Sequence, residues 1–200
     1  MQKLGFLRET TELAQKAGLD ADTDLHRTGL DEYLSIIFPN INDWVHDKST
    51  GLVQDDGKPK RTRPDYRSDA LNLIVEFDGL PHYTDPAIII NDELNTKFYE
   101  KHGYTVVRIP YFIQLTNKAV QTFFGISIDT PLFDESIPSI GPKGQNTPAY
   151  LCYAGIQRMA AEFHRFPEQY AVNLAFLKSQ PDIRLTRFDL LELEYNRIDD

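Results

Sequence analysis

The chain has 200 residues and a formal net charge of −9, and its 41% hydrophobic and 26% charged residues are ordinary for a globular protein. This length favours one domain with a well-buried core, the apolar runs are too short to cross a membrane, and the acidic balance argues against non-specific coating of nucleic acid. Because Cys152 is the only cysteine, no intrachain disulfide can form, and without a signal-peptide pattern at the N-terminus we expect a cytoplasmic protein.

Two helices are predicted in the first forty residues. Apolar side chains at helical spacing cover residues 4–17 and stop at Gly18. A second stripe of this kind covers residues 30–38. Asp31 and Glu32 fall in the first turn of the second helix, where a carboxylate interacts favourably with the helix dipole.

A meander of three strands follows. Residues 41–46 predict its first strand, and Pro64-Asp65 opens the second. The apolar, β-branched run at residues 71–77 predicts a buried third strand. Residues 47–60 are rich in turn-forming residues and are typical of a hairpin connection between the first two strands.

The next predicted elements are a helix and a strand. The pattern leaves two starts open for the helix, either at Pro86 or later, with Asn91 or Asp92 as its cap. The helix ends before Gly103, and residues 104–109 predict a β-branched strand. Because a helix crosses between this strand and the preceding one, we expect the two strands to be parallel.

The rest of the chain is predicted to be mostly helical. The expected helices cover residues 112–124, 149–166 and 168–178. Residues 125–148 are rich in Pro, Gly, Ser and Asp and are typical of a long irregular excursion, whereas residues 183–195 fit either a strand or a docking helix. We therefore expect an α/β core over residues 1–124, with the excursion and a helical extension over residues 125–200 packed on the same domain.

Acidic side chains gather at one end of the predicted sheet. Glu76 and Asp78 end the third strand and, being two residues apart, share one of its faces. Asp65 on the neighbouring strand can lie beside them. Three carboxylates at one sheet edge repel each other unless a cation holds them, and hard divalent ions prefer such oxygen ligands. The sequence therefore predicts a Mg²⁺ or Mn²⁺ site.

Several motifs occur in a fixed order around these acids. They are Glu32 on a helix, Pro64-Asp65 on a strand, Glu76-Phe77-Asp78-Gly79 at a strand end, His82, Asp92 on a helix, and the Gly-Tyr-x-Val-x-Arg strand at residues 103–108. This order resembles the PD-(D/E)xK nuclease superfamily, and most closely its very-short-patch-repair endonuclease branch. The resemblance covers about residues 30–111, less than half of the chain. It implies a restriction-endonuclease-like core, a central mixed β-sheet flanked by helices.

Metal-assisted hydrolysis of a phosphodiester bond is the chemistry that the resemblance implies. Asp65 and Glu76 would bind the metal ion, and Asp78 would add a ligand. Glu32 would approach from the helix as an outer-shell ligand or as a ligand to a second metal, with Asp31 as its substitute if the helix register differs.

The site departs from the superfamily at the position of its usual lysine. Asp78 stands where the superfamily usually has a lysine, which would position the attacking water and stabilise the transition state. His82 is the candidate for this role, because an imidazole exchanges a proton near neutral pH; Lys58 or Lys60 could instead reach in from the hairpin. Asp92 would hold His82 or cap its own helix, and Asp78 would otherwise orient His82.

A basic cluster directly precedes the acidic strand. Its members are Lys58, Lys60, Arg61 and Arg63, which we expect either to bind nucleic acid or to lie on a solvated loop. The leading hypothesis is a metal-dependent endonuclease acting on double-stranded DNA in restriction, defence or mismatch nicking, as a homodimer or with a partner protein. The alternatives are a nuclease fold that only binds nucleic acid or protein, and a metal-dependent phosphohydrolase of a small molecule.

Overall fold

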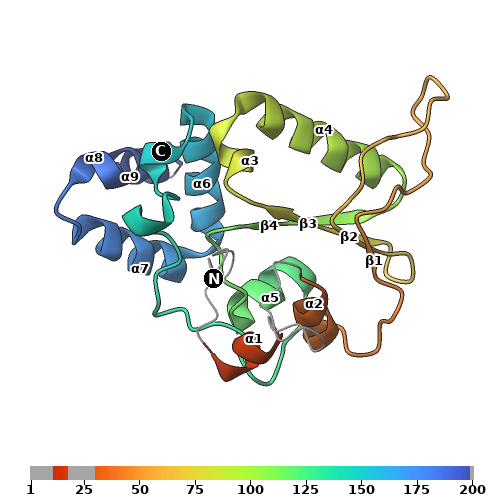
Figure 1. Ribbon diagram of the computed structural model, residues 1–200, viewed down its shortest axis with the longest axis horizontal. Helices are drawn as coiled ribbons and strands as arrows, with labels where there is room; N and C mark the ends of the chain where they lie inside the picture. Colours follow the sequence, from red (N-terminus) through yellow and green to blue (C-terminus); the bar gives the residue numbers. More distant parts are fainter. Residues whose placement is uncertain (1–10, 18–29, 199–200) are drawn as a thin grey trace.

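A four-stranded mixed sheet, in the order β1-β2-β3-β4, lies at the centre of the computed structural model, which describes residues 11–17 and 30–198 (Figure 1). The strands are β1 (Val45–His46), β2 (Tyr66–Ser68), β3 (Leu73–Asp78) and β4 (Thr105–Pro110). The first three strands form the predicted antiparallel meander, and β4 is parallel to β3, also as predicted. Helix α4 (Pro86–Lys101) supplies the crossover that a parallel neighbour requires.

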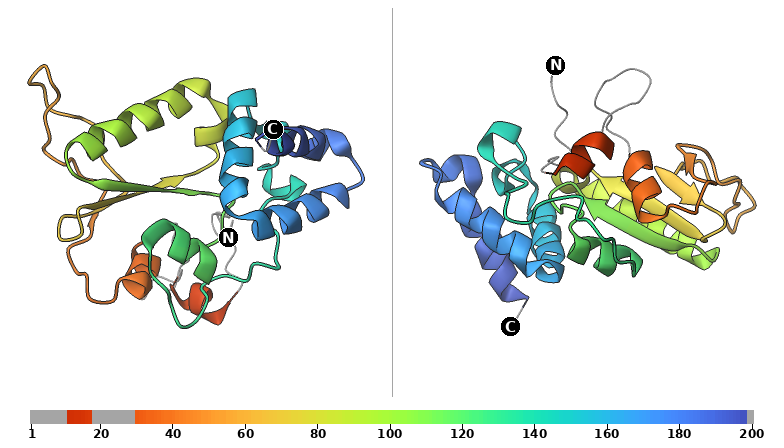
Figure 2. Two further views of the ribbon diagram at one scale, coloured as in Figure 1. Left: turned by 180° about the vertical axis from the view of Figure 1, so that it is seen from behind. Right: turned by 90° about the horizontal axis from the view of Figure 1, so that it is seen from below.

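Helices cover both faces of the sheet. Figures 1 and 2 show α4 over one face, and α2 (Asp31–Ile37) and α5 (Asn117–Phe124) over the other. The hydroxyl of Tyr66, which pairs with Val75 in β3, donates to Asp31 at 3.2 Å, so these strand residues point towards α2. Because side chains alternate along a strand, Glu76 and Asp78 point to the face that α4 covers.

The C-terminal helices pack beside the end of the sheet (Figure 1). They are α6 (Tyr153–Arg165), α7 (Pro167–Lys178), α8 (Ile183–Thr186) and α9 (Phe188–Arg197). The remaining short elements are α1 (Glu12–Ala17), α3 (Pro81–Thr84) and the 3₁₀ turns Pro142–Gly144 and Pro148–Tyr150. Helix α6 contacts both α3 and α4, and one hydrophobic cluster joins residues from α1 to α9. Among the helices that the structure describes, none is long and apolar enough to cross a membrane.

Hydrogen bonds from side chains to the backbone decide where two helices begin. Asp85 accepts a hydrogen bond from the backbone N–H of Ala87 at 2.8 Å, so α4 starts at Pro86 and the later start was wrong. The predicted helix over residues 112–124 is helical only from Asn117. Its first part is held in another conformation by the side chain of Gln169, which bonds the N–H and C=O of Gln114 at 2.8 and 2.9 Å.

Three other predicted elements agree with the structure to different degrees. Residues 183–195, which fitted a strand or a helix, form α8 and α9. Residues 41–46 contain only a two-residue strand. The predicted first helix over residues 4–17 is described only from Thr11, and it is helical from Glu12; its earlier part lies outside the described residues.

Candidate functional site

Asp65 and Glu76 lie opposite each other where β2 meets β3. The strand register pairs Tyr66 with Val75, which places Asp65, one residue earlier, across from Glu76. Each carboxylate accepts a backbone hydrogen bond from the other strand: Phe77 N–H donates to Asp65 Oδ2 at 2.7 Å, and Asp65 N–H donates to Glu76 Oε2 at 3.2 Å. The two acids predicted from the sequence as metal ligands are therefore held side by side by the sheet backbone.

The pKa values of both of these carboxyl groups are raised. Burial and the nearby charge of Asp65 raise the pKa of Glu76 to about 7, although Arg108, its register partner on β4, opposes the rise. Burial also raises the pKa of Asp65, against the hydrogen bond from Phe77. Two half-buried acids that resist ionisation form a site where a proton or a metal cation is stabilising.

Asp78 has a different environment from its neighbour Glu76. It is fully buried, and Arg108 binds it with two nitrogens, Nε at 2.9 Å from Oδ2 and Nη2 at 2.5 Å from Oδ1. The Nη2 atom also lies 2.9 Å from Asp92 Oδ1, so one guanidinium joins a strand acid to a helix acid. Such two-pronged pairs are the strongest hydrogen bonds that a carboxylate forms with a side chain.

Arg158, from helix α6, binds the same two acids. Its Nη2 lies 2.5 Å from Asp78 Oδ2, and its Nη1 lies 2.7 Å from Asp92 Oδ2. The side chains of Arg108 and Arg158 are only 14% and 17% exposed, so two guanidinium charges balance two carboxylate charges inside the protein. Buried ions are tolerated when they are paired in this way.

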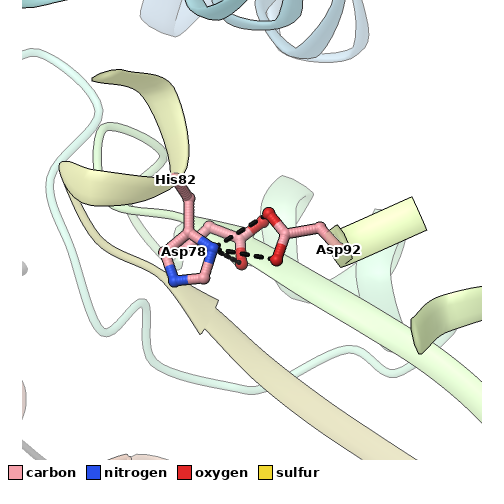
Figure 3. Close-up of side chains that lie close together, drawn as sticks. All are labelled: Asp78, His82 and Asp92. Carbon is pink, nitrogen blue, oxygen red and sulfur yellow. Dashed lines mark hydrogen bonds and ion pairs between the residues drawn. The ribbon is translucent and has the colours of Figure 1, made fainter. Parts of the chain in front are cut away.

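His82 lies at the edge of this network (Figure 3). Its Nδ1 is 2.9 Å from Asp92 Oδ2 and 3.5 Å from Asp78 Oδ1. Burial raises the pKa of Asp92, but the hydrogen bonds from His82 and Arg158 and the charge of Arg108 together outweigh it and lower this pKa. Asp92 is therefore ionised and Nδ1 donates. The other ring nitrogen, Nε2, points away from both carboxylates in Figure 3.

The charge of His82 affects Asp65 as well as its own partners. Burial lowers the pKa of the imidazole, but the bond to Asp92 and the charges of Asp78 and Asp92 outweigh it, so this pKa is raised. Its positive charge in turn lowers the pKa of Asp65. The imidazole therefore acts electrostatically on Asp65, one member of the acid pair.

The side chains of Asp78, His82 and Asp92 are also close enough together to hold a metal ion. One ligand atom from each lies within 4.8 Å of the others. However, every oxygen of the two carboxylates already accepts a hydrogen bond or ion pair from Arg108, Arg158 or His82. A metal ion here would have to displace guanidinium groups, so the spacing is suitable but the ligands are occupied.

Glu32, the predicted helix acid, comes from a different side of the sheet. It lies on α2, which covers the face that Tyr66 points to, whereas Glu76 points to the α4 face. Its neighbour Asp31, the predicted substitute, accepts the bond from Tyr66.

The predicted basic cluster lines a hollow of about 480 Å³ beside the acid pair's strand. Lys58, Lys60 and Arg61 line it, together with Gln54, Pro59 and Thr62. Lys58 pairs with Asp56 at 2.8 Å, and Lys60 donates to Asn95 of α4 at 2.7 Å. The fourth member, Arg63, lies 3.3 Å from Asp47. Local acids therefore partly neutralise the cluster, and Arg61 is exposed.

Sequence reasoning missed the roles of both buried arginines. Arg108 belonged to the motif that carried the resemblance, but it was given no role in the site. Arg158 had no local signal, since nothing in the pattern of its helix distinguishes it from Arg165, which binds Glu162 at 2.8 Å. Only the folding of α6 onto α3 brings Arg158 to acids that lie 66 and 80 residues earlier.

Comparison with known proteins gives no relative for this chain: no family model, no curated protein and no solved structure matches it.

Proposed function

We propose that this protein is a metal-dependent endonuclease that hydrolyses phosphodiester bonds in double-stranded DNA. The observation that carries the proposal is the acid pair Asp65–Glu76, two adjoining half-buried carboxyl groups whose pKa values are both raised. Such a pair is costly without a neutralising cation. Mg²⁺ and Mn²⁺ are the ions that oxygen ligands of this kind favour.

The donor set fits a hard divalent ion. Asp65 Oδ2 and Glu76 Oε2 accept backbone hydrogen bonds, which fix the two side chains and leave Asp65 Oδ1 and Glu76 Oε1 without a partner among the described residues. These two oxygens would hold the metal ion. When bound, such an ion neutralises charge on the scissile phosphate and makes water more acidic. Asp78, predicted as a third ligand, instead binds Arg108 and Arg158.

His82 takes the role of the missing lysine in this proposal. Because Nδ1 donates to Asp92, the lone pair of a neutral ring is on Nε2, the nitrogen that points away from Asp78 and Asp92 in Figure 3. Nε2 can accept a proton from the attacking water, and the ionised Asp92 stabilises the imidazolium that forms. The arrangement is that of a general base whose orientation is fixed by a carboxylate.

Two further features support a nucleic-acid substrate. The element order of α2, three meander strands, α4 and a parallel β4 is the order expected of a restriction-endonuclease-like core. The hollow containing Lys58, Lys60 and Arg61 lies on the segment that leads directly into Asp65, where a DNA backbone could approach. We propose a cytoplasmic enzyme that acts as a homodimer or with a partner protein.

A second candidate function is a nuclease fold that binds without cleaving. It is favoured by the engagement of Asp78 with two guanidinium groups at the position where the superfamily has a catalytic lysine. In this case the basic hollow would still bind its ligand, but no bond would be cleaved.

Plasmid cleavage separates the two candidates. Supercoiled DNA is incubated with Mg²⁺ or Mn²⁺ and the wild type, Glu76→Gln, or the matched control Glu93→Gln, whose side chain is exposed on α4. We expect cleavage by the wild type and the control and none by Glu76→Gln. DNA binding without cleavage by any of the three would favour the binding module, and cleavage by Glu76→Gln at the wild-type rate would exclude the acid pair as the active site.

A further inference from the structure

We infer that Arg158 is a positioning residue that holds His82 in its working orientation, so that the C-terminal helices are part of the active site. The catalytic consequence rests on the proposed function, but the positioning itself does not. Among the described residues of α6–α9, only Arg158 forms a hydrogen bond with Asp78, His82 or Asp92.

One guanidinium group reaches all three members of the network. Its Nη1 lies 2.7 Å from Asp92 Oδ2 and 3.2 Å from the backbone oxygen of His82. Its Nη2 lies 2.5 Å from Asp78 Oδ2. A single nitrogen therefore binds both the main chain of His82 and the carboxylate that accepts from its ring. This geometry fixes the distance between the imidazole and its partner.

Helix α6, which carries Arg158, packs closely against helix α3, which carries His82. A Cβ added at Gly155 would lie 1.9 Å from the backbone oxygen of Tyr83, so only glycine permits this approach. The same oxygen accepts a hydrogen bond from Cys152 N–H at 3.1 Å. The Arg158 guanidinium also lies 5.0 Å from the centre of the Tyr83 ring, within range of a cation–π interaction.

Helix α3 needs such support from outside. It has only four residues, its N-cap provides no side-chain hydrogen bond, and so short a helix is not stable alone. Its C-terminal half is bonded to α6 through Tyr83 and His82. The orientation of His82 therefore depends on a contact between two parts of the chain that are 76 residues apart.

Lysine cannot replace this guanidinium. An ammonium group is a single point of charge, whereas the planar guanidinium presents two separate NH₂ groups, here directed at different acids. In Arg158→Lys a single nitrogen replaces two that lie at separate positions, so the variant cannot reproduce both contacts at their present geometry, and in Arg158→Met no donor remains. The matched control is Arg165→Met, on the same helix, which removes a guanidinium that binds Glu162 at 2.8 Å.

The test uses the full chain and reads the tautomer of His82 by ¹⁵N NMR, at a pH where the ring is neutral, with the signals identified by their loss in His82→Gln. We expect the Nδ1–H form in the wild type and in Arg165→Met. In Arg158→Met and Arg158→Lys we expect a shift towards the Nε2–H form, which free imidazole side chains prefer. If Arg158→Met does not fold, Arg158→Lys decides alone.

Cleavage kinetics provide the second readout. For the folded Arg158 variants we expect kcat to fall about 10- to 100-fold with little change in KM, because a misplaced base affects the chemical step more than binding. Wild-type tautomer signals in these variants would overturn the positioning role. If the wild type cleaves no DNA, the proposed function fails, and the tautomer measurement still decides whether Arg158 positions His82.

Discussion

Replacing Glu76 by Gln should change how the stability of the fold depends on pH. Burial and Asp65 raise the pKa of Glu76 from its ordinary value of 4.5 to about 7 in the folded protein. Below pH 4.5 the carboxyl is protonated in both the folded and the unfolded states, and it costs nothing. Above about pH 7 it is ionised in both, and the folded state is penalised in full.

The magnitude follows from that difference in pKa. A pKa difference of about 2.5, at about 1.4 kcal/mol for each unit, gives a penalty of about 3–4 kcal/mol above pH 7. The folded state binds the proton more tightly than the unfolded state, so this contribution to stability is lost as pH rises from about 4.5 to 7. Glu76→Gln has no such loss, so its free energy of unfolding relative to the wild type should rise by about 3–4 kcal/mol over that interval.

Urea unfolding followed by the fluorescence of Trp44, the single tryptophan, measures this difference at pH 5 and pH 8 in a metal-free buffer. Adding Mg²⁺ at 100 times its dissociation constant should restore about 2.7 kcal/mol to the wild type at pH 8, and nothing to Glu76→Gln. Glu93→Gln serves as the control and should follow the wild type throughout. An equal stability difference between Glu76→Gln and the wild type at both pH values would refute the reasoning.

Three other substitutions test separate parts of the account. Arg108→Met removes one of two guanidinium groups from a pair of buried acids and should lower the free energy of unfolding in urea by about 3–5 kcal/mol, whereas Arg184→Met on the surface should lower it by less than about 0.5 kcal/mol. A loss below about 1 kcal/mol for Arg108→Met would contradict the burial of this network. Gly155→Ala should destabilise the fold by about 1–3 kcal/mol, because its Cβ would meet a backbone oxygen at 1.9 Å, while Gly79→Ala, with its nearest atoms at 3.7 Å, should destabilise it less. Equal losses of stability would mean that α6 does not pack this closely against α3. Arg61→Ala should weaken DNA binding, and the slope of the logarithm of the binding constant against the logarithm of the salt concentration should become shallower by about one. Fluorescence anisotropy over a salt series measures this slope, and an unchanged slope would mean that Arg61 does not contact DNA.

The sheet could be predicted because its signals are local. The apolar run at residues 71–77 encodes β3, observed as Leu73–Asp78, and the turn residues around it fix the meander. Asp85-Pro86 carries both a capping side chain and a residue suited to the first helical turn, so the observed start of α4 was one of the two that the sequence offered. In each case the information lies within a few residues of the element.

The predicted helix over residues 112–124 shows where local pattern is insufficient. Its apolar residues have helical spacing, but the backbone of Gln114 is bonded by the side chain of Gln169, which lies 55 residues later. Thr116 then caps the true helix by accepting from Ala119 N–H at 3.2 Å. Tertiary hydrogen bonds outweighed the intrinsic helical preference, and no window of the sequence contains them.

The site divides in the same way. Asp65 and Glu76 were placed together because strand pairing and alternation are local rules, and the register brings them opposite each other. The environment of Asp78 could not be predicted, because it depends on Arg108 from a parallel strand and on Arg158 from α6. Acids on one strand face suggested three ligands, but the long-range contacts give the third acid two guanidinium partners.

Calorimetric titration with Mn²⁺ decides whether the Asp65–Glu76 pair is a metal site, because it shows which acids bind the ion. The proposal predicts that the wild type binds Mn²⁺, that Asp65→Asn and Glu76→Gln lose this binding, and that His82→Gln keeps it. Binding that survives both acid substitutions, or that is lost in His82→Gln and kept in Glu76→Gln, would contradict the proposal and move the metal ion to the Asp78–His82–Asp92 group.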